Sequence, residues 1–222
     1  MPGFPAGLPP FGAIILAGGR GHRLGGADKP GLRVGGATLA GIAVSAAVAA
    51  CARRVVIVGP DRPELVPLTA GLPGGLTVLR EDPPGSGPVP ALRCGLAALR
   101  EPRAVVLAAD LPFLQARHLR TLREAVDPGM PGSAGSGNVR TAGAVFADAE
   151  GRPQWLAGCW RSAVLRSALG SYCGASLHGV LGSLEPVLVR GDEADGLAGP
   201  WLDCDTPDDL ERARRIASAE GP

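Results

Sequence analysis

The chain has 222 residues, of which 45% are hydrophobic and 4% aromatic, so it is long enough for one domain with a mainly aliphatic core. Its net charge of +1 indicates no general affinity for nucleic acid or for an anionic membrane surface. The 34 glycines and 22 prolines follow no fixed period, which excludes a collagen-like protein.

The five cysteines are odd in number and show no Cys-x-x-Cys spacing. This usage argues against a disulfide framework or a structural zinc site, and it indicates thiols in the reducing cytoplasm. Residues 1–11 lack the charged start and apolar centre of a signal peptide, and we expect them to form a flexible tail. Residues 12–222 are then expected to form a single domain.

Short apolar runs that alternate with helical patterns predict a fold of the α/β class. The longest apolar stretch, residues 37–51, is too short to span a bilayer and predicts a buried helix capped by Thr38. The region 151–190 is less regular and is expected to form a substrate-side subdomain. Near the end, Thr206 and Pro207 fit a helix start. Strands are predicted at 13–17, 55–58, 76–79, 104–109, 141–146 and 153–158, and further helices at 91–100, 115–126, 162–169 and 177–181.

Alternation of this kind favours a doubly wound, mostly parallel sheet with helices on both faces, in which ligands bind beyond the carboxyl ends of the strands. The first such end is the glycine-rich loop LAGGRGHRLGGADK, which contains Gly18, Gly19 and Arg23 and ends at Lys29. Lys29 is the only lysine of the chain, and lysine presents a compact point charge where arginine presents a fork. The loop fits neither the dinucleotide pattern nor the P-loop pattern, yet its glycines and cations suit a phosphate. The alternative is a solvated turn.

Carboxylates follow two other predicted strand ends. Asp110 ends the run AVVLAAD, where a carboxylate suits a hard cation such as Mg²⁺; its alternative role is a cap for the helix near Gln115. Asp203 and Asp205 lie two residues apart and would repel each other unless a cation or water lay between them. Asp205 could also be a second polar residue at a helix start. Asp110 and Asp205 beside Lys29 would form a metal-assisted phosphoryl or nucleotidyl transfer site.

These segments resemble the nucleotidyltransferases of the molybdenum cofactor guanylyltransferase type, whose signature loop is LAGGxxxRMGxxK. The segment GSGPVPALRCGL is similar to the family's Gly-Pro-Leu-Ala-Gly segment, and AADLPFL resembles its metal-binding Asp strand. DCDTPDDL resembles the ending Asn-x-Asn-Thr-Pro-Glu-Glu-Leu, and RPQWLAGCWRSAVL a substrate-side strand and helix. The resemblance covers nearly the whole chain.

The resemblance implies a Rossmann-like nucleotidyltransferase fold and Mg²⁺-dependent transfer of GMP from GTP to the terminal phosphate of molybdopterin, with release of pyrophosphate. It implies GTP and molybdopterin as substrates, transient contacts with molybdoenzymes or cofactor chaperones, and no nucleic-acid or membrane partner. Arg23 would face the pyrophosphate and Lys29 would neutralise phosphate charge, as the catalytic pair. Mg²⁺ would be held by Asp110 and Asp205. The implied nucleotide-binding residues are Leu16, Ala17, Gly18, Gly19, Lys29, Asp82 and Asp110, with Glu81 competing for the place of Asp82.

The chain departs from the family pattern where Leu24 replaces Met and where Asp203 and Asp205 replace two Asn residues. Carboxylates at those two positions also occur in relatives that transfer cytidylyl groups, whereas the second glycine of LAGG and the segment GPVPAL favour guanine. Two alternatives therefore stay open: a cytidylyltransferase acting on molybdopterin or another phosphorylated acceptor, and a nucleotide-binding accessory protein without catalysis.

Overall fold

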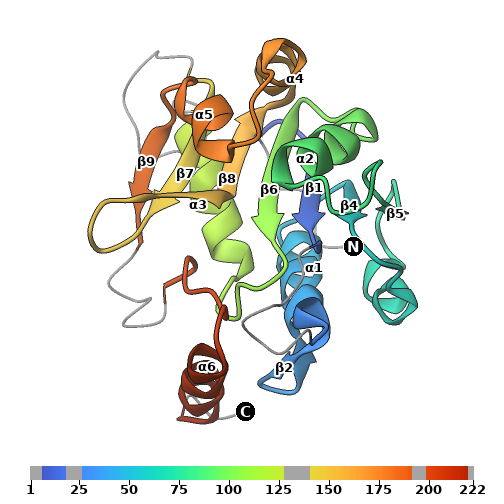
Figure 1. Cartoon of the computed structure of the whole chain (residues 1–222), viewed down its shortest axis with the longest axis vertical. Helices are drawn as coiled ribbons and strands as arrows, with labels where there is room; N and C mark the ends of the chain where they lie inside the picture. Colours follow the sequence, from blue (N-terminus) through green and yellow to red (C-terminus); the bar gives the residue numbers. More distant parts are fainter. Residues whose placement is uncertain (1–6, 19–26, 128–140, 192–198, 220–222) are drawn as a thin grey trace.

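The computed structural model describes residues 7–18, 27–127, 141–191 and 199–219 of the chain. Within these residues, seven strands form a central sheet in the order β5-β4-β1-β6-β8-β7-β9 (Figure 1). The strands are β1 (Phe11–Leu16), β4 (Arg54–Val58), β5 (Leu76–Leu79), β6 (Arg103–Ala108), β7 (Gly143–Ala147), β8 (Pro153–Arg161) and β9 (Val187–Arg190).

The sheet is mostly parallel, as predicted. β1 pairs in parallel with β4 on one side and with β6 on the other, and β4 pairs in parallel with β5. β8 runs antiparallel to both of its neighbours, β6 and β7, while β9 again runs parallel to β7. The four neighbouring parallel strands β5, β4, β1 and β6 therefore bring their carboxyl ends to one edge of the sheet, and β8 brings its amino end to the same edge.

Helices cover both faces of this sheet, which confirms the doubly wound class. α1 and α3 pack on one face, and α2, α4 and α5 pack on the other. α6 packs instead against the small β2–β3 hairpin beyond the carboxyl edge of the main sheet (Figure 1). The bounds of these elements are α1 (Leu39–Ala49), α2 (Pro88–Ala97), α3 (Ala116–Val126), α4 (Ser162–Ser171), α5 (Leu177–Gly182), α6 (Pro207–Ala219), β2 (Arg33–Val34) and β3 (Ala37–Thr38), with short 3-10 helices η2 (Lys29–Gly31) and η3 (Pro63–Thr69).

Both predicted helix caps are present. The Thr38 hydroxyl accepts a hydrogen bond from the Gly41 N–H at 3.1 Å at the start of α1. At the start of α6, the Thr206 hydroxyl accepts from the Asp209 N–H at 3.2 Å, and the Asp209 carboxylate accepts from the Thr206 N–H at 2.8 Å. This reciprocal pair is a capping box, which fixes where α6 begins and hence where the preceding loop ends.

The structure differs from the expectations drawn from the sequence in three places. Phe11 was expected in the tail, but it begins β1 and is completely buried, with the guanidinium of Arg123 4.3 Å from its ring centre. The sequence pattern missed β9 and the β2–β3 hairpin, because edge strands and two-residue strands carry little hydrophobic alternation. Segment 151–190, expected to form a substrate-side subdomain, supplies β8 to the sheet between β6 and β7. Its residues Ala157, Cys159 and Trp160 are buried in the main core. The glycine-rich stretch DPGMPGSAGSGN predicts a surface loop over 127–138. Of this loop only Asp127, the residue that ends α3, lies within the described residues.

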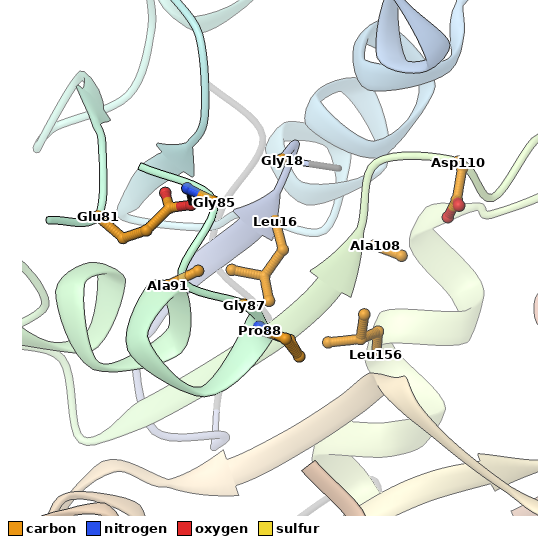
Figure 2. Close-up of a pocket in the computed structure, with 10 residues that line it drawn as sticks. All are labelled: Leu16, Gly18, Glu81, Gly85, Gly87, Pro88, Ala91, Ala108, Asp110 and Leu156. Atoms are coloured by element: carbon orange, nitrogen blue, oxygen red, sulfur yellow. Dashed lines mark hydrogen bonds between the residues drawn. The ribbon is translucent and has the colours of Figure 1, made fainter. Parts of the chain in front are cut away.

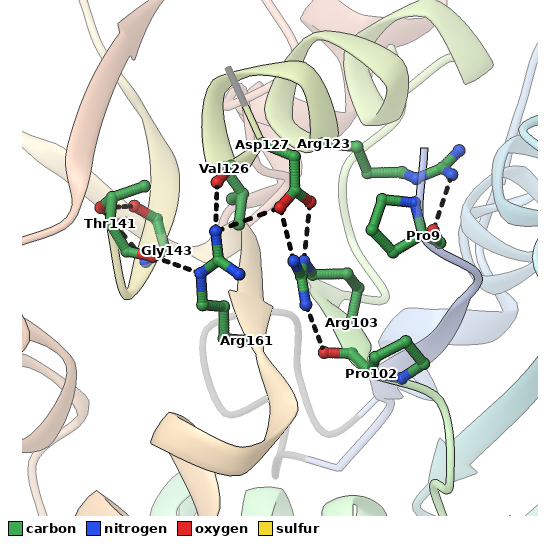
Figure 3. A network of polar contacts seen from close by, with 9 residues as sticks. All are labelled: Pro9, Pro102, Arg103, Arg123, Val126, Asp127, Thr141, Gly143 and Arg161. Atoms are coloured by element: carbon green, nitrogen blue, oxygen red, sulfur yellow. Dashed lines mark hydrogen bonds and ion pairs between the residues drawn. The ribbon is translucent and has the colours of Figure 1, made fainter. Parts of the chain in front are cut away.

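A buried polar network ties the opposite edge of the sheet together (Figure 3). Arg103, the first residue of β6, donates to the Asp127 carboxylate through Nε at 2.7 Å and through a second guanidinium nitrogen. Arg161, the last residue of β8, donates to the same carboxylate at 3.1 Å and to the carbonyl oxygens of Val126 and Thr141. Asp127 thus links the end of α3 to β6 and β8, far from the carboxyl edge.

No helix in the described part of the chain is long and apolar enough to cross a membrane.

Candidate functional site

The site begins where three distant segments meet at the carboxyl edge of the sheet. Lys29 follows the loop after β1, Asp110 follows β6, and Asp205 precedes α6. The Lys29 ammonium donates hydrogen bonds to the Asp110 carboxylate and, at 2.5 Å, to Asp205 Oδ1. The predicted convergence of the lone lysine with both acidic segments is therefore present.

Neither carboxylate serves the alternative role considered for it. α3 is capped by Gln115, whose N–H donates to His118 Nδ1 at 3.0 Å, so Asp110 is not its cap. α6 is capped by Thr206 and Asp209, and the Asp205 carboxylate faces Lys29. Both aspartates are thus held at the strand edge by their place in the chain, with their charge directed to the ammonium.

Burial and charge act in opposite directions on Lys29. Burial lowers the pKa of the ammonium, but the two adjacent carboxylates, Asp110 above all, outweigh it and leave the pKa raised above its usual value. The side chain of Lys29 is 15% exposed to solvent. Lys29 is therefore positively charged at neutral pH and could neutralise an anionic ligand bound beside Asp110.

The acidic groups around Lys29 suit a hard cation. Asp110 Oδ1 is buried and has no hydrogen-bond partner among the described residues, so one oxygen of this carboxylate lacks a donor or cation. Burial and the charges of Asp205 and Asp110 raise the pKa of Asp203. Burial raises the pKa of the Cys204 thiol to about 12, so this thiol is neutral at physiological pH.

No cluster of three or more His, Cys, Asp or Glu side chains in the described part of the chain forms a complete metal site. Mg²⁺ commonly uses one or two protein carboxylates and takes its other ligands from water and substrate phosphates. The oxygen donors of Asp110 and Asp205 fit that kind of shared site, so the residues present are compatible with Mg²⁺ held together with a nucleotide.

Asp28, which precedes Lys29, belongs to a separate ion pair. The guanidinium of Arg62 contacts both carboxylate oxygens of Asp28, with Nη1 2.5 Å from Oδ2. Arg62 is 6% exposed, and its hydrogen bond lowers the pKa of Asp28 below the usual value. This pair could not be predicted from the sequence, because the two residues lie on different loops and arginine is common throughout the chain.

A first cavity of about 270 Å³ opens beside Asp110 (Figure 2). Its walls come from the end of β1, the start of α2 and the segment between β5 and α2, and Figure 2 shows Asp110 at one end and Glu81 at the other. The apolar side chains between them make the cavity largely nonpolar, with a carboxylate at each end. The lining residues are Leu16, Gly18, Glu81, Gly85, Gly87, Pro88, Ala91, Ala108, Asp110 and Leu156.

Glu81 and Asp82, the two residues that compete for one nucleotide contact, differ in their position. Glu81 is 8% exposed and lines the first cavity, where its carboxylate accepts a hydrogen bond from the Gly85 N–H at 2.8 Å. Asp82 is exposed and does not line this cavity.

The first loop is only partly described. Leu16 and Gly18 line the first cavity, but Ala17 is buried and its N–H donates to the Val58 carbonyl at 2.9 Å. The Ala17 N–H is therefore engaged with β4. Gly19 and Arg23 lie outside the described residues.

A second cavity of about 270 Å³ lies on the other side of Asp110. Trp155 on β8 and Trp201 in the segment before α6 contribute its aromatic walls. Trp155 is steadied by an edge contact with His178, with ring centres 5.6 Å apart, and Trp201 lies 6.2 Å from Phe146. Sequence reasoning did not single out either tryptophan, although three tryptophans in an aromatic-poor chain were a usable signal.

The two cavities share Ala108, Asp110 and Leu156. The polar residues of the second cavity include Gln154 and Asp203 in addition to Asp110. A ligand in each cavity would therefore meet the other at the Asp110 carboxylate. The arrangement suits a reaction between two bound molecules beside a cation.

Comparisons with known proteins agree with this geometry. Residues 13–187 match the family model of the MobA-like NTP transferase domain. The chain is 29% identical over 215 residues to a probable molybdenum cofactor guanylyltransferase of Natronomonas pharaonis, covering 92% of this chain and 97% of that one. It is 33% identical over 119 residues to a molybdenum cofactor guanylyltransferase of Pseudomonas fluorescens, covering 53% of this chain and 56% of the relative. The match therefore spans about half the length of that relative.

Solved structures share the fold. A nucleotidyl transferase from Methanothermobacter superposes with a TM-score of 0.70 at 20% identity, over 95% of this chain and 99% of that one. A 2-C-methyl-D-erythritol 4-phosphate cytidylyltransferase from Thermus thermophilus gives a TM-score of 0.61 at 19% identity, over 93% and 98% of the two chains. Because the family model covers most of the chain and the described fold agrees with it, the chain belongs to the MobA-like NTP transferase family, a family of nucleotidyltransferases.

Proposed function

We propose that the protein catalyses Mg²⁺-dependent transfer of GMP from GTP to the terminal phosphate of molybdopterin. The observation that carries this proposal is the contact of Lys29 with both Asp205 and Asp110, of which Asp110 lines two cavities. The names of the curated relatives in Pseudomonas and Natronomonas support the choice of substrates.

The reaction joins an acceptor phosphate oxygen to the α-phosphorus of GTP and breaks the bond from that phosphorus to the bridging oxygen of pyrophosphate. No covalent enzyme intermediate is needed, so catalysis consists of positioning and charge neutralisation. Lys29 neutralises charge that develops on the phosphates, and Arg23 faces the departing pyrophosphate. The backbone of Gly18 would approach the phosphates closely, because glycine has no side chain to stand in the way. Gly19 is proposed to bind the nucleotide with it.

Asp110 and Asp205 hold Mg²⁺ together with the triphosphate in this proposal. Bound there, the ion supplies positive charge to the α-phosphate and its leaving group. Because Lys29 contacts both carboxylates, a triphosphate that shares Mg²⁺ with Asp110 and Asp205 would lie within reach of its ammonium. Lysine suits this position because its flexible stem carries a compact charge.

The first cavity accepts the nucleoside. Glu81 is a buried carboxylate at its far end, and guanine carries two neighbouring donors, N1–H and N2–H₂, that a carboxylate accepts. Cytosine has one amino donor on the corresponding edge. A buried acceptor left unpaired is costly, so Glu81 favours GTP over CTP.

The second cavity accepts molybdopterin. Trp155 and Trp201 offer flat apolar surfaces for its ring system, and Asp110 at the shared edge marks where its phosphate would meet the nucleotide. We place the enzyme in the cytoplasm: all five cysteines lie in the described part of the chain and are unpaired thiols. Molybdoenzymes or cofactor chaperones are the proposed recipients of the product.

The cytidylyl alternative retains one observation in its favour. Asp203 and Asp205 replace two Asn residues of the guanylyl family ending, and Asp203 lines the acceptor cavity rather than the nucleoside cavity. The substitution therefore bears on the acceptor more than on the base, which leaves GTP the preferred nucleotide.

Incubation of the purified protein with Mg²⁺, molybdopterin and each of the four nucleoside triphosphates tests the proposal by pyrophosphate release. Release with GTP alone is the expected result. Release with CTP alone would establish the cytidylyl alternative, and tight nucleotide binding without release would establish the accessory protein. A Glu81→Gln variant should lose preference for GTP by about tenfold while keeping turnover with saturating nucleotide.

A further inference from the structure

Arg62 is an unusually placed arginine. It follows β4, at the start of η3, and it is 6% exposed although its charge would favour water. Its two terminal nitrogens contact the two carboxylate oxygens of Asp28, and Glu64 lies 3.7 Å away. Arg62 Nε is buried without a partner among the described residues. The hydrogen bonds of this guanidinium to a carboxylate are therefore those that its two terminal nitrogens donate to Asp28.

The partner, Asp28, is the residue immediately before Lys29. Asp28 is directed to the β4 side of β1, where Arg62 lies, and Lys29 is directed to the β6 side, where Asp110 lies. Residues 28 and 29 therefore lie across the carboxyl end of β1. On one side Asp28 pairs with the cation of Arg62, and on the other side Lys29 pairs with the carboxylate of Asp110.

The local backbone adapts to this contact. The Gly31 N–H donates to the Asp28 carbonyl at 3.0 Å, and the Leu32 N–H donates to the Lys29 carbonyl at 3.1 Å, which closes a tight turn. A Cβ atom at Gly31 would overlap Asp28 Oδ2 and lie 3.3 Å from Arg62 Nη1. Glycine at this position leaves space for the Asp28–Arg62 pair.

We propose that Arg62 is a positioning residue for Lys29: its two-point contact with Asp28 fixes the main chain so that the lysine ammonium meets Asp110 and Asp205. Two parallel hydrogen bonds fix direction as well as distance, which a single contact does not. The inference rests on the proposed function, in which Lys29 acts on the triphosphate, and a displacement of about 1 Å at such a group lowers turnover by about a hundredfold.

The single lysine makes the test direct. Protein labelled with ¹³C at lysine Cε gives one lysine resonance, that of Lys29, which reports its environment without substrate. The variant is Arg62→Gln, and the matched control is Arg103→Gln, which also breaks a buried two-point contact with an aspartate but at the opposite edge of the sheet. Should Arg62→Gln not fold, Asp28→Asn breaks the same contact from its more exposed side.

We expect Arg62→Gln and Asp28→Asn to move the Lys29 resonance and to lower kcat about tenfold or more, with the KM for GTP changed less than about twofold. Arg103→Gln should lower Tm and leave both the resonance and kcat unchanged. An unmoved Lys29 resonance in Arg62→Gln and Asp28→Asn would overturn the inference. Absence of turnover in the wild type with every triphosphate would instead overturn the proposed function, because the resonance is measured without substrate.

Discussion

Lys29 and Asp110 are 81 residues apart in the chain, yet their side chains form a direct ion pair at the carboxyl edge of the sheet. β1 and β6 are neighbours in that sheet, so the segments that follow them begin side by side. The pair joins the one lysine of the protein to Asp110, which lines both cavities, and the proposed reaction depends on this placement.

Lys29→Arg should lower kcat/KM for GTP by about tenfold to a hundredfold, although the positive charge is kept. The planar fork is larger than an ammonium and cannot occupy the same point between Asp110 and Asp205. Steady-state kinetics with pyrophosphate detection checks this. Wild-type kcat/KM in the variant would show that a point charge is not required.

Asp110→Asn should lower kcat by about a hundredfold or more while leaving the fold intact, because the side chain keeps its shape and loses its charge. Mn²⁺ binding in the presence of GTP, followed by electron paramagnetic resonance, should weaken in parallel. Circular dichroism and Tm serve as the folding control. Full activity in this variant would remove Asp110 from the metal role.

Asp203→Asn should raise Tm by about 1–2 °C at pH 7 to 8. Burial and the nearby charges of Asp205 and Asp110 raise the pKa of Asp203, so its charged form disfavours the folded state above that pKa. Well below pH 3.8, the ordinary pKa of an aspartate side chain, this carboxyl is neutral in both the folded and the unfolded state. The difference in Tm between the variant and the wild type should therefore vanish there. A Tm difference that does not change between pH 3 and pH 8 would contradict the electrostatic cause.

Trp155→Ala should raise the KM for molybdopterin by about tenfold and leave the KM for GTP within about twofold, because Trp155 lines only the second cavity. Titrating each substrate at saturation of the other separates the two constants. A rise in the KM for GTP instead would mean that the two cavities have been assigned in the wrong order.

Gly95→Ala should destabilise the fold by about 1–3 kcal/mol, because the new methyl group would lie 2.5 Å from Ile14 Cγ2 and 3.0 Å from Val58 Cγ2. The matched substitution is Gly170→Ala in α4, where nothing lies within 4 Å, and it should be neutral or stabilising by up to about 1 kcal/mol. Urea denaturation measures both. Equal effects would show that α2 can shift away from β1.

Local patterns were sufficient to predict most of the fold. The apolar runs of β1, β4 and β6 and the caps Thr38 and Thr206 were readable because strand burial and helix capping depend on neighbouring residues. The antiparallel course of β8 was not readable, since hydrophobic alternation gives the same pattern for either direction of pairing.

The sequence by itself identified a cationic loop and two acidic segments, because Lys29 stands alone in composition and Asp110 and Asp205 stand at the ends of readable elements. Only the tertiary structure decided which side chains meet. The tertiary structure places Glu81, and not Asp82, in the wall of the first cavity. It also pairs Asp28 with Arg62 and brings Trp155 and Trp201 to one cavity. Such contacts depend on strand order and on the side to which each residue points, and neither quantity is encoded within any short stretch of chain.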